Sequence, residues 1–410
     1  MTNTLLAYNY QKSYSTYVNY LIIEVSKFLN TVSIEQSKIK IIMKLEKINQ
    51  NQHSSLATMN RLQVLHLAGS RVSEFYYNLS ILYAKEVVQP VGVSSYYAVV
   101  HPDGLWQLGA SLDSLSEKML LQEMIPQLPQ IDVVVPHMFC LLGMTSFRAF
   151  FEDMLNLPLV GSPSHCTALA TNKAQTRSVV SASGVQVAKA QQLRRGETLT
   201  MRPPFVVKPT SEDNSLGVTL VWDESQIEAA LDKGFELDDQ LLVEDYIPGR
   251  ELRVAVVERK GELQVLPMIE YLVTEEHPIR TLHDKLVLQS DGTPGKQPEK
   301  PIAKPICPAN VTPELFDKLV NAAKSAHIAL GCRDYSLYDF RVHTKTNEPY
   351  FLEAGLFWSF GKISMISRML QADGQNLEDV ALELWSAAAG RTRVACGSLF
   401  KWYEKCLSRD

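Results

Sequence analysis

A lysine at the end of an apolar run, Lys208, is the most informative residue for chemistry. Residues 205–207 precede it, and a polar loop that ends at Gly217 follows. Small residues let backbone N–H groups approach phosphate oxygens, and a lysine at the end of a strand neutralises their charge. Lys173 lies upstream, at the start of an expected helix. Taken alone, Lys208 and its loop could equally form a hairpin turn with a surface lysine.

Three carboxylates follow the lysines. Residues 242–249 could pair an extended backbone with the edge of an adenine, and Glu251 could accept hydrogen bonds from ribose hydroxyls. Asp339 and Glu353 lie on two expected neighbouring strands, where hard oxygen ligands bind Mg²⁺ together with nucleotide phosphates. The alternatives are an edge strand with a solvated glutamate and two surface carboxylates. The order of all five residues favours a site for ATP and Mg²⁺.

The elements that must position these residues alternate between strands and helices, which predicts an α/β protein. In a first domain at 59–160 we expect a parallel sheet, with strands at 62–69 and 131–137 and helices at 74–85 and 146–155. In a second unit at 161–245 we expect a helix at 172–183, strands at 204–209, 218–221 and 240–247, and a helix at 224–233. In a third at 246–390 we expect strands at 250–258, 264–269, 338–343 and 349–352, and helices at 313–330 and 377–388.

The two ends of the chain differ from this pattern. Residues 1–58 are rich in Asn, Gln, Ser, Tyr and Lys, and a helical patch at 17–48 gives way to a polar run. Such a segment cannot bury enough apolar surface to fold, so we expect a disordered or helical extension. Residues 391–410 are expected to form a tail.

Composition excludes several classes of protein. The 410 residues carry a net charge of -5 from dispersed charges, which leaves no basic field for nucleic acid. No stretch approaches the roughly 18 to 20 apolar residues of a membrane span. The six cysteines lack metal-ligand spacing and fit reduced thiols, so we expect a cytoplasmic enzyme with no membrane or nucleic-acid partner.

The order of lysines, loop and carboxylates resembles the ATP-grasp family, and most closely its D-alanine–D-alanine ligase branch. The resemblance covers about residues 62–390 and is closest at 206–209, 243–251 and 329–333. It implies a three-domain ATP-grasp fold with an N-terminal sheet domain. It also implies an ATP-dependent enzyme that forms carbon–nitrogen bonds with ATP and Mg²⁺, and it suggests a homodimer.

Carried over by position, the resemblance implies roles for eleven residues. For the nucleotide it implies phosphate contacts at Lys173, Lys208 and Ser215, an adenine pocket at Glu244 and Ile247, a ribose ligand at Glu251, and Mg²⁺ ligands at Asp339 and Glu353. For the substrates, Glu74 lies near the family's amino-group-binding glutamate, and His137 takes the place of a substrate-proximal histidine. Ser364 matches the serine that holds the carboxylate of the incoming amino acid. His137 could equally be a histidine at a strand end, and Ser364 a helix N-terminal serine.

Departures from the family concern the substrates more than ATP. Gly355 replaces an asparagine ligand of the second metal, and Leu337 replaces an arginine that steadies the developing oxyanion. A family serine matches Asn214. Arg253 should share a strand face with Glu251, so it could supply the missing charge, with Arg280 and Lys285 as the next candidates. Otherwise Arg253 pairs with a surface carboxylate.

Two further stretches, 278–286 and 353–360, look like those of cyanobacterial ligases that make mycosporine-like amino acids. That resemblance implies that a small amino acid is joined to mycosporine-glycine through a phosphorylated intermediate. The aromatic run at 356–361 would suit a ring-bearing substrate, although such a run is as often core packing. The alternatives are a D-alanine–D-alanine ligase and a non-catalytic nucleotide-binding protein.

Overall fold

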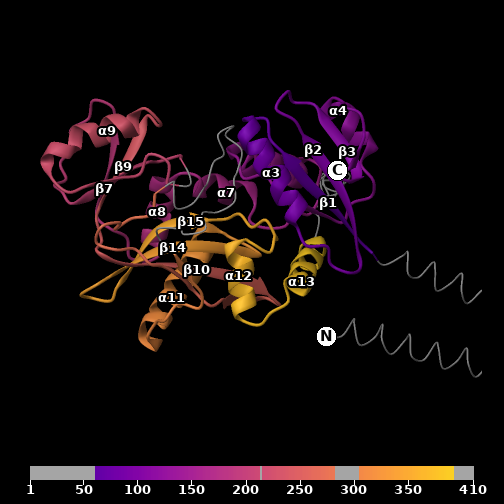
Figure 1. The fold of residues 1–410 in the computed structure, drawn as a ribbon. Coiled ribbons are helices and arrows are strands. Elements are labelled where there is room, and N and C mark those ends of the chain that lie inside the picture. The colour runs from indigo at the N-terminus through magenta and orange to yellow at the C-terminus, as the bar shows by residue number, and fades with distance from the viewer. Residues whose placement is uncertain (1–60, 213–214, 282–303, 392–410) are drawn as a thin grey trace, which may run out of the picture. The chain divides into compact units, whose positions relative to one another are not determined.

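The computed structural model describes residues 61–212, 215–281 and 304–391 (Figure 1). The chain divides into two units, Met1–Arg61 and Leu62–Asp410. The sheets and helices of the described residues belong to the second unit. The expected helical patch at 17–48, the expected tail, Asn214 and Lys285 lie outside the described residues.

The first sheet has five strands in the order β4-β3-β2-β1-β5. Its strands are β1 (Leu62–Gly69), β2 (Val93–Val100), β3 (Trp106–Ser111), β4 (Ser114–Leu115) and β5 (Val133–Pro136). The prediction of a parallel sheet holds for β2-β1-β5 and is wrong at the other edge, where β2, β3 and β4 pair antiparallel. The reason is the short connection at 101–105, which can join only antiparallel neighbours.

Several helices accompany this sheet. The helix expected at 74–85 is α3 (Glu74–Glu86), capped by the Ser73 side chain. The helix expected at 146–155 is α6 (Ser146–Ala149), which continues as one π-helical turn at Phe150–Met154. Short helices also form at α4 (Leu121–Met124) and α5 (Leu141–Met144).

The second sheet is antiparallel, in the order β6-β9-β7-β8. Its strands are β6 (Ala190–Arg194), β7 (Phe205–Pro209), β8 (Thr219–Val221) and β9 (Gln240–Asp245), and α9 (Ile227–Phe235) packs on it. Helices α7 (Ser164–Ala170) and α8 (Lys173–Ala182) pack against the third sheet. The predicted hairpin of β7 and β8 is confirmed. The edge-strand alternative for residues 242–249 is wrong, because β9 pairs with β6 on one side and β7 on the other.

The third sheet has the order β13-β12-β10-β14-β15, and β11 also pairs with β10. Its strands are β10 (Gly249–Arg259), β11 (Glu262–Val265), β12 (Ile269–Tyr271), β13 (Pro305–Ile306), β14 (Tyr335–His343) and β15 (Pro349–Gly355). The single strand expected at 264–269 is wrong: β11 and β12 are two strands, and Pro267, which cannot donate to a ladder, lies between them.

Helices α11 (Pro313–Leu330), α12 (Met365–Ala372) and α13 (Leu377–Ala389) complete this part of the chain, and α12 was not predicted. One apolar core contains side chains of β5, β10, α12 and α13, including Val133, Ala255, Met369 and Trp385, all fully buried. This shared core holds the first sheet against the third. Within the described residues, the helices are too short or too polar to cross a bilayer.

Candidate active site

A pocket of about 660 Å³, its open mouth included, lies where the second and third sheets face each other. All eight residues that the sequence predicted for nucleotide, metal or phosphate line it together, namely Lys173, Lys208, Ser215, Glu244, Ile247, Glu251, Asp339 and Glu353.

The strand pairing explains why the carboxylates meet. Strands β10 and β14 run antiparallel with Glu251 opposite Arg341 and Arg253 opposite Asp339. On the other side of β14, Asp339 is opposite Glu353 on β15. Because side chains two residues apart share a face, these five form a patch of alternating charge on one face of the sheet. The sequence prediction that Asp339 and Glu353 lie on neighbouring strands is confirmed.

The ion pairs within this patch are short and buried. Arg253 donates to Asp339 through Nε to Oδ1 at 2.5 Å and through Nη2 to Oδ2 at 2.6 Å. Arg341 donates from Nη1 to Glu251 Oε2 at 3.3 Å. Asp339 is 3% exposed and Glu251 5%. The alternative for Arg253, a surface carboxylate partner, is therefore wrong: its partner is buried and lines the pocket.

A loop arginine joins the two cross-strand pairs. Arg280 donates from Nε to Glu251 Oε1, and from Nη2 to Asp339 Oδ2 at 2.9 Å. Its guanidinium also lies over the ring of Tyr271, 3.7 Å from the centroid. Arg280 thereby connects two carboxylates that the resemblance assigns to different parts of a nucleotide–metal complex.

Asp339 and Arg253 stay ionised despite burial. Burial by itself would raise the pKa of Asp339, but Arg253 and Arg280 outweigh it and hold that pKa below its ordinary value. Burial would lower the pKa of Arg253, and the carboxylate of Asp339 reverses the shift, so that pKa stands well above its usual range. These two side chains are therefore fixed charges at neutral pH.

Two lysines line the pocket, Lys208 on β7 and Lys173 on α8. Lys208 Nζ lies 2.5 Å from Glu244 Oε2, and Arg177 Nε lies 3.2 Å from Glu244 Oε1. Lys173, the first residue of α8, donates to the carbonyl oxygen of Glu212 in the loop after β7. Lys208 is largely buried in the pocket wall, so the surface-lysine alternative is wrong.

Asp339 and Glu353 fit a divalent cation by ligand type and by place, because two oxygen donors face each other across adjacent strands beside the lysines. Both oxygens of Asp339 accept from guanidinium groups in this structure. Among the described residues, no group of three or more His, Cys, Asp or Glu side chains is arranged to hold a metal by itself. Phosphate oxygens and water would have to complete a coordination shell.

The predicted substrate residues are not in the pocket lining. Glu74 is exposed in the first turn of α3. His137 is fully buried, and its Nε2 lies 2.9 Å from Nδ1 of His66. Ser364 is the N-cap of α12, where its Oγ accepts from Ser367 N and from Trp358 Nε1 at 2.9 Å. The structure thus agrees with the alternatives given for His137 and Ser364, and any substrate role for the three stays a prediction.

The aromatic run after β15 is mostly core. Trp358 and Phe360 stack with ring centroids 4.0 Å apart and are buried. Phe357 is half-buried and contacts Tyr83 and Phe139, with centroids 5.2 Å apart in each case. Only Phe357, of these three rings in the run, could meet a substrate.

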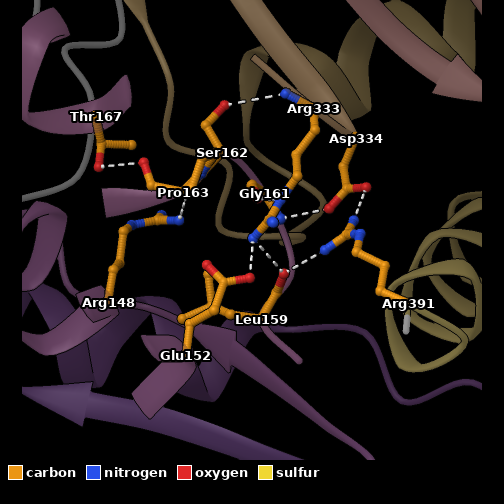
Figure 2. Close-up of polar contacts among 10 residues, drawn as sticks. All are labelled: Arg148, Glu152, Leu159, Gly161, Ser162, Pro163, Thr167, Arg333, Asp334 and Arg391. Atoms are coloured by element: carbon orange, nitrogen blue, oxygen red, sulfur yellow. Dashed lines mark hydrogen bonds and ion pairs between the residues drawn. The ribbon is translucent and has the colours of Figure 1, made fainter. Parts of the chain in front are cut away.

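Sequence reasoning missed Arg341, although a signal existed. It lies two residues after Asp339 on the same strand, so period-two alternation places both on one face. It also missed a second ion network, shown in Figure 2, in which Arg148, Glu152, Arg333, Asp334 and Arg391 meet around the segment 159–162. Its members come from distant parts of the chain, and no local pattern connects them.

Comparison with known proteins shows which proteins this chain is similar to. Residues 179–385 match the family model described as "D-ala D-ala ligase C-terminus". The D-alanine–D-alanine ligase of Citrifermentans bemidjiense is 30% identical over 241 residues, which is 58% of this chain and 72% of that protein. That of Geobacter sulfurreducens is 31% identical over 236 residues, 56% of this chain and 68% of its own length.

Solved structures agree at the level of the fold. The D-alanine–D-alanine ligase of Coxiella burnetii superposes with a TM-score of 0.66 at 19% identity, covering 85% of this chain and 99% of its own. That of Bacillus anthracis, solved in complex with ATP, gives 0.58 at 18% identity, covering 81% and 98%. The predicted α/β architecture of the ATP-grasp type is confirmed.

Proposed function

The chain belongs to the D-alanine–D-alanine ligase family, and we propose that it phosphorylates an oxygen of one substrate with ATP and then joins an amine to the activated carbon. Members of this family are ATP-dependent ligases that form carbon–nitrogen bonds, with ATP and Mg²⁺ as cofactors. The sequence also allowed a non-catalytic nucleotide-binding protein, but these relatives are enzymes.

One observation carries the proposal. A single pocket collects Lys173 from α8, Lys208 from the second sheet, and Glu251, Asp339 and Glu353 from the third. Lysines beside carboxylates suit a triphosphate that is held together with a divalent cation. A ligand held in this way has its terminal phosphorus fixed for in-line attack by an oxygen.

The residues would act by position and charge. Lys173 and Lys208 would neutralise the phosphate oxygens during transfer, and Glu251 would hold the ribose hydroxyls. Asp339 and Glu353 would hold Mg²⁺, which supplies charge neutralisation to the phosphate oxygens when bound. The terminal phosphoryl group passes to a substrate oxygen and ADP leaves. The amine then attacks the carbon that bears that oxygen, phosphate departs with the oxygen, and the amine loses a proton to solvent or a nearby base.

Arg253 would replace the arginine that the family has at the position of Leu337. It reaches the patch from the neighbouring strand: Arg253 is opposite Asp339, and Leu337 is opposite Ala255. A guanidinium held by Asp339 at 2.5 Å keeps a positive charge beside the metal ligands. This position suits stabilisation of charge that develops on a transferring phosphoryl group or on the attacked carbon's oxygen.

The substrate pair that the relatives favour is D-alanine with D-alanine, because both relatives carry that name. A second candidate, a small amino acid joined to mycosporine-glycine, rests on the local departures. Leu337 removes a charge near the acceptor, and the half-buried ring of Phe357 offers an apolar surface. A Cβ added at Gly355 would meet Leu337 at 3.8 Å, so the backbone does not require the glycine that replaces the family asparagine.

The deciding experiment measures ADP release and product mass with each pair in parallel. D-alanine alone, mycosporine-glycine with glycine or serine, and each single substrate as a blank are incubated with Mg²⁺ and ATP. The proposal expects one pair to release one ADP per ligated product. If protein that is shown to bind ATP releases no ADP with either pair, both substrate assignments are contradicted. ADP release without any ligated product would contradict the ligase chemistry.

A further inference from the structure

Arg280 stands where two different parts of a bound nucleotide–metal complex would have to bind. Its Nε donates to Glu251 Oε1, and its Nη2 lies 2.9 Å from Asp339 Oδ2. Under the proposed function, on which this inference rests, Glu251 holds the ribose and Asp339 holds Mg²⁺. One side chain therefore occupies acceptor positions that ribose and metal both need.

Arg280 is held by specific buried contacts. Arg280 is 6% exposed, and the Tyr271 ring supports the guanidinium face at 3.7 Å. Tyr271 is in turn opposite Glu251 in the pairing of β10 and β12. Cation, ring and carboxylate thus share one closed contact, which is stronger than an exposed ion pair because water screens it less.

A divalent cation at Asp339 conflicts with this contact. Oδ1 accepts from Arg253 Nε, and Oδ2 accepts from both Arg253 Nη2 and Arg280 Nη2. Mg²⁺ binds a carboxylate oxygen at about 2.1 Å, which would place three positive groups around one carboxylate. Because like charges repel strongly at such distances in a partly buried site, at least one guanidinium has to leave before the metal enters.

Of the two arginines, Arg280 is the one whose surroundings allow it to leave. Arg253 belongs to the middle of β10 and is tied to Asp339 by two hydrogen bonds. Arg280 follows β12 in a segment without regular secondary structure and makes a single hydrogen bond to Asp339. A triphosphate in the pocket would offer Arg280 several anionic oxygens, which charge-assisted hydrogen bonds favour.

We propose that Arg280 is an internal counter-ion that excludes divalent cations from Asp339 until a nucleotide triphosphate draws its guanidinium away. Metal entry is then coupled to nucleotide entry. The nucleotide-free protein therefore binds Mg²⁺ only weakly at Asp339. Tight metal binding at this carboxylate requires a bound nucleotide triphosphate. Arg280 acts through Asp339 and is a positioning residue.

The test is a titration of the nucleotide-free protein with Mn²⁺. Electron paramagnetic resonance measures the Mn²⁺ that stays free in solution. We expect weak binding by the wild type and binding at least about tenfold tighter by Arg280→Gln, because one repelling charge is gone. Arg280→Lys, which keeps the charge, should stay close to wild type. The matched control is Arg250→Gln, a β10 arginine that pairs with Glu270 outside the pocket, and it should change nothing.

Two results would overturn the inference. One is that Arg280→Gln, folded by circular dichroism, binds Mn²⁺ no more tightly than wild type. The other is that the gained binding persists when Asp339→Asn is added. If Arg280→Gln does not fold, Arg280→Met decides, because it also removes the charge and keeps an apolar contact with Tyr271. Mn²⁺ binding by that variant no tighter than by wild type contradicts the inference. None of these readouts needs turnover, so the proposed ligase activity can fail separately.

Discussion

Two buried networks of arginines and carboxylates lie in the described part of the chain, and they differ in the groups that their charged side chains contact. In the pocket, Arg253 and Arg280 meet Asp339 and Glu251 side chain to side chain. In the network of Figure 2, the arginines hold main chain as well. Arg333 donates from Nε to the Gly161 carbonyl at 2.7 Å, and Arg391 donates from Nη1 to the Leu159 carbonyl at 2.6 Å.

The same contrast holds for the carboxylates. Asp334 accepts from the backbone N–H of Gly161 at 2.6 Å, whereas both carboxylates of the pocket pairs accept only from side chains in the bonds described above. Side-chain partners can be exchanged for a ligand's oxygens or a metal ion without moving the backbone. Backbone partners cannot, because losing them releases the loop. The pocket network is therefore suited to binding, and the Figure 2 network to holding segment 159–162 against β14.

The largest effect is expected from the carboxylates that would hold Mg²⁺. Asp339→Asn and Glu353→Gln should each abolish product formation, because no other carboxylate stands between β14 and β15 in the pocket lining. Turnover is measured by coupled ADP release, with circular dichroism to confirm the fold. A variant that keeps more than about a tenth of wild-type turnover, a loss below ~1.4 kcal/mol, would refute the assignment.

Arg253 should come next. Arg253→Ala should lower turnover by about 10²-fold, as expected for the loss of one stabiliser of developing charge. Arg280 remains beside Asp339, so the fold should persist. The comparison sharpens with Leu337→Arg added to the variant: if Arg253 replaces the family arginine, this second change should restore part of the activity. A single variant within a few-fold of wild type would show that the charge comes from elsewhere.

The Figure 2 network should respond in stability and not in ATP binding. Asp334→Asn keeps a residue that tolerates the positive φ of 63° at this position but removes the charge that Arg391 and Gly161 N–H contact. We expect a loss of about 1–3 kcal/mol in the free energy of unfolding, measured in urea. ATP affinity should be unchanged. Asp103→Asn, which breaks the exposed pair with Lys118, is the control and should leave the free energy of unfolding nearly unchanged.

The buried pair of His66 and His137 should make stability depend on pH. Burial lowers the pKa of His66 to about 3, and it also places the pKa of His137 well below its ordinary value, with His66 adding to the shift. Both are neutral when folded and take up protons when unfolded, so stability should fall as pH drops below about 6.5. The slope is about 1.4 kcal/mol per pH unit for each histidine.

This slope can be measured by urea unfolding between pH 7.5 and pH 5. His66→Gln should reduce the slope of the free energy of unfolding against pH by the contribution of one histidine. His165→Gln, which changes an exposed histidine on α7, should leave the slope as it is. Equal slopes for His66→Gln and wild type would mean that the pair is not kept neutral by burial.

The two networks also mark how far sequence alone could go. Lys208, Glu251 and Asp339 could be found because each ends or belongs to a strand with a strong local pattern, and short motifs in a fixed order compound their specificity. The pairing of Asp339 with Glu353 followed from the short connection between their strands. These residues were predicted as a set, and the structure brings the set into one pocket.

Other parts depended on tertiary packing. Arg280 lies in a stretch without periodicity, so its contacts with β10 and β14 had no local signal. Arg333 and Glu152 are 181 residues apart, and only the folded chain makes them partners. The hairpin of β2 and β3 was missed because the run at 93–100 does not alternate clearly between apolar and polar residues.

The central claim, that ATP phosphorylates a substrate oxygen in the pocket, is tested most directly by isotope transfer. The accepted substrate is labelled with ¹⁸O, in the D-alanine carboxylate or in the ring oxygen of the mycosporine, and the released phosphate is analysed by mass spectrometry. The account predicts one ¹⁸O atom in each phosphate formed with a ligated product. Ligated product accompanied by unlabelled phosphate, or by label in AMP, would contradict it.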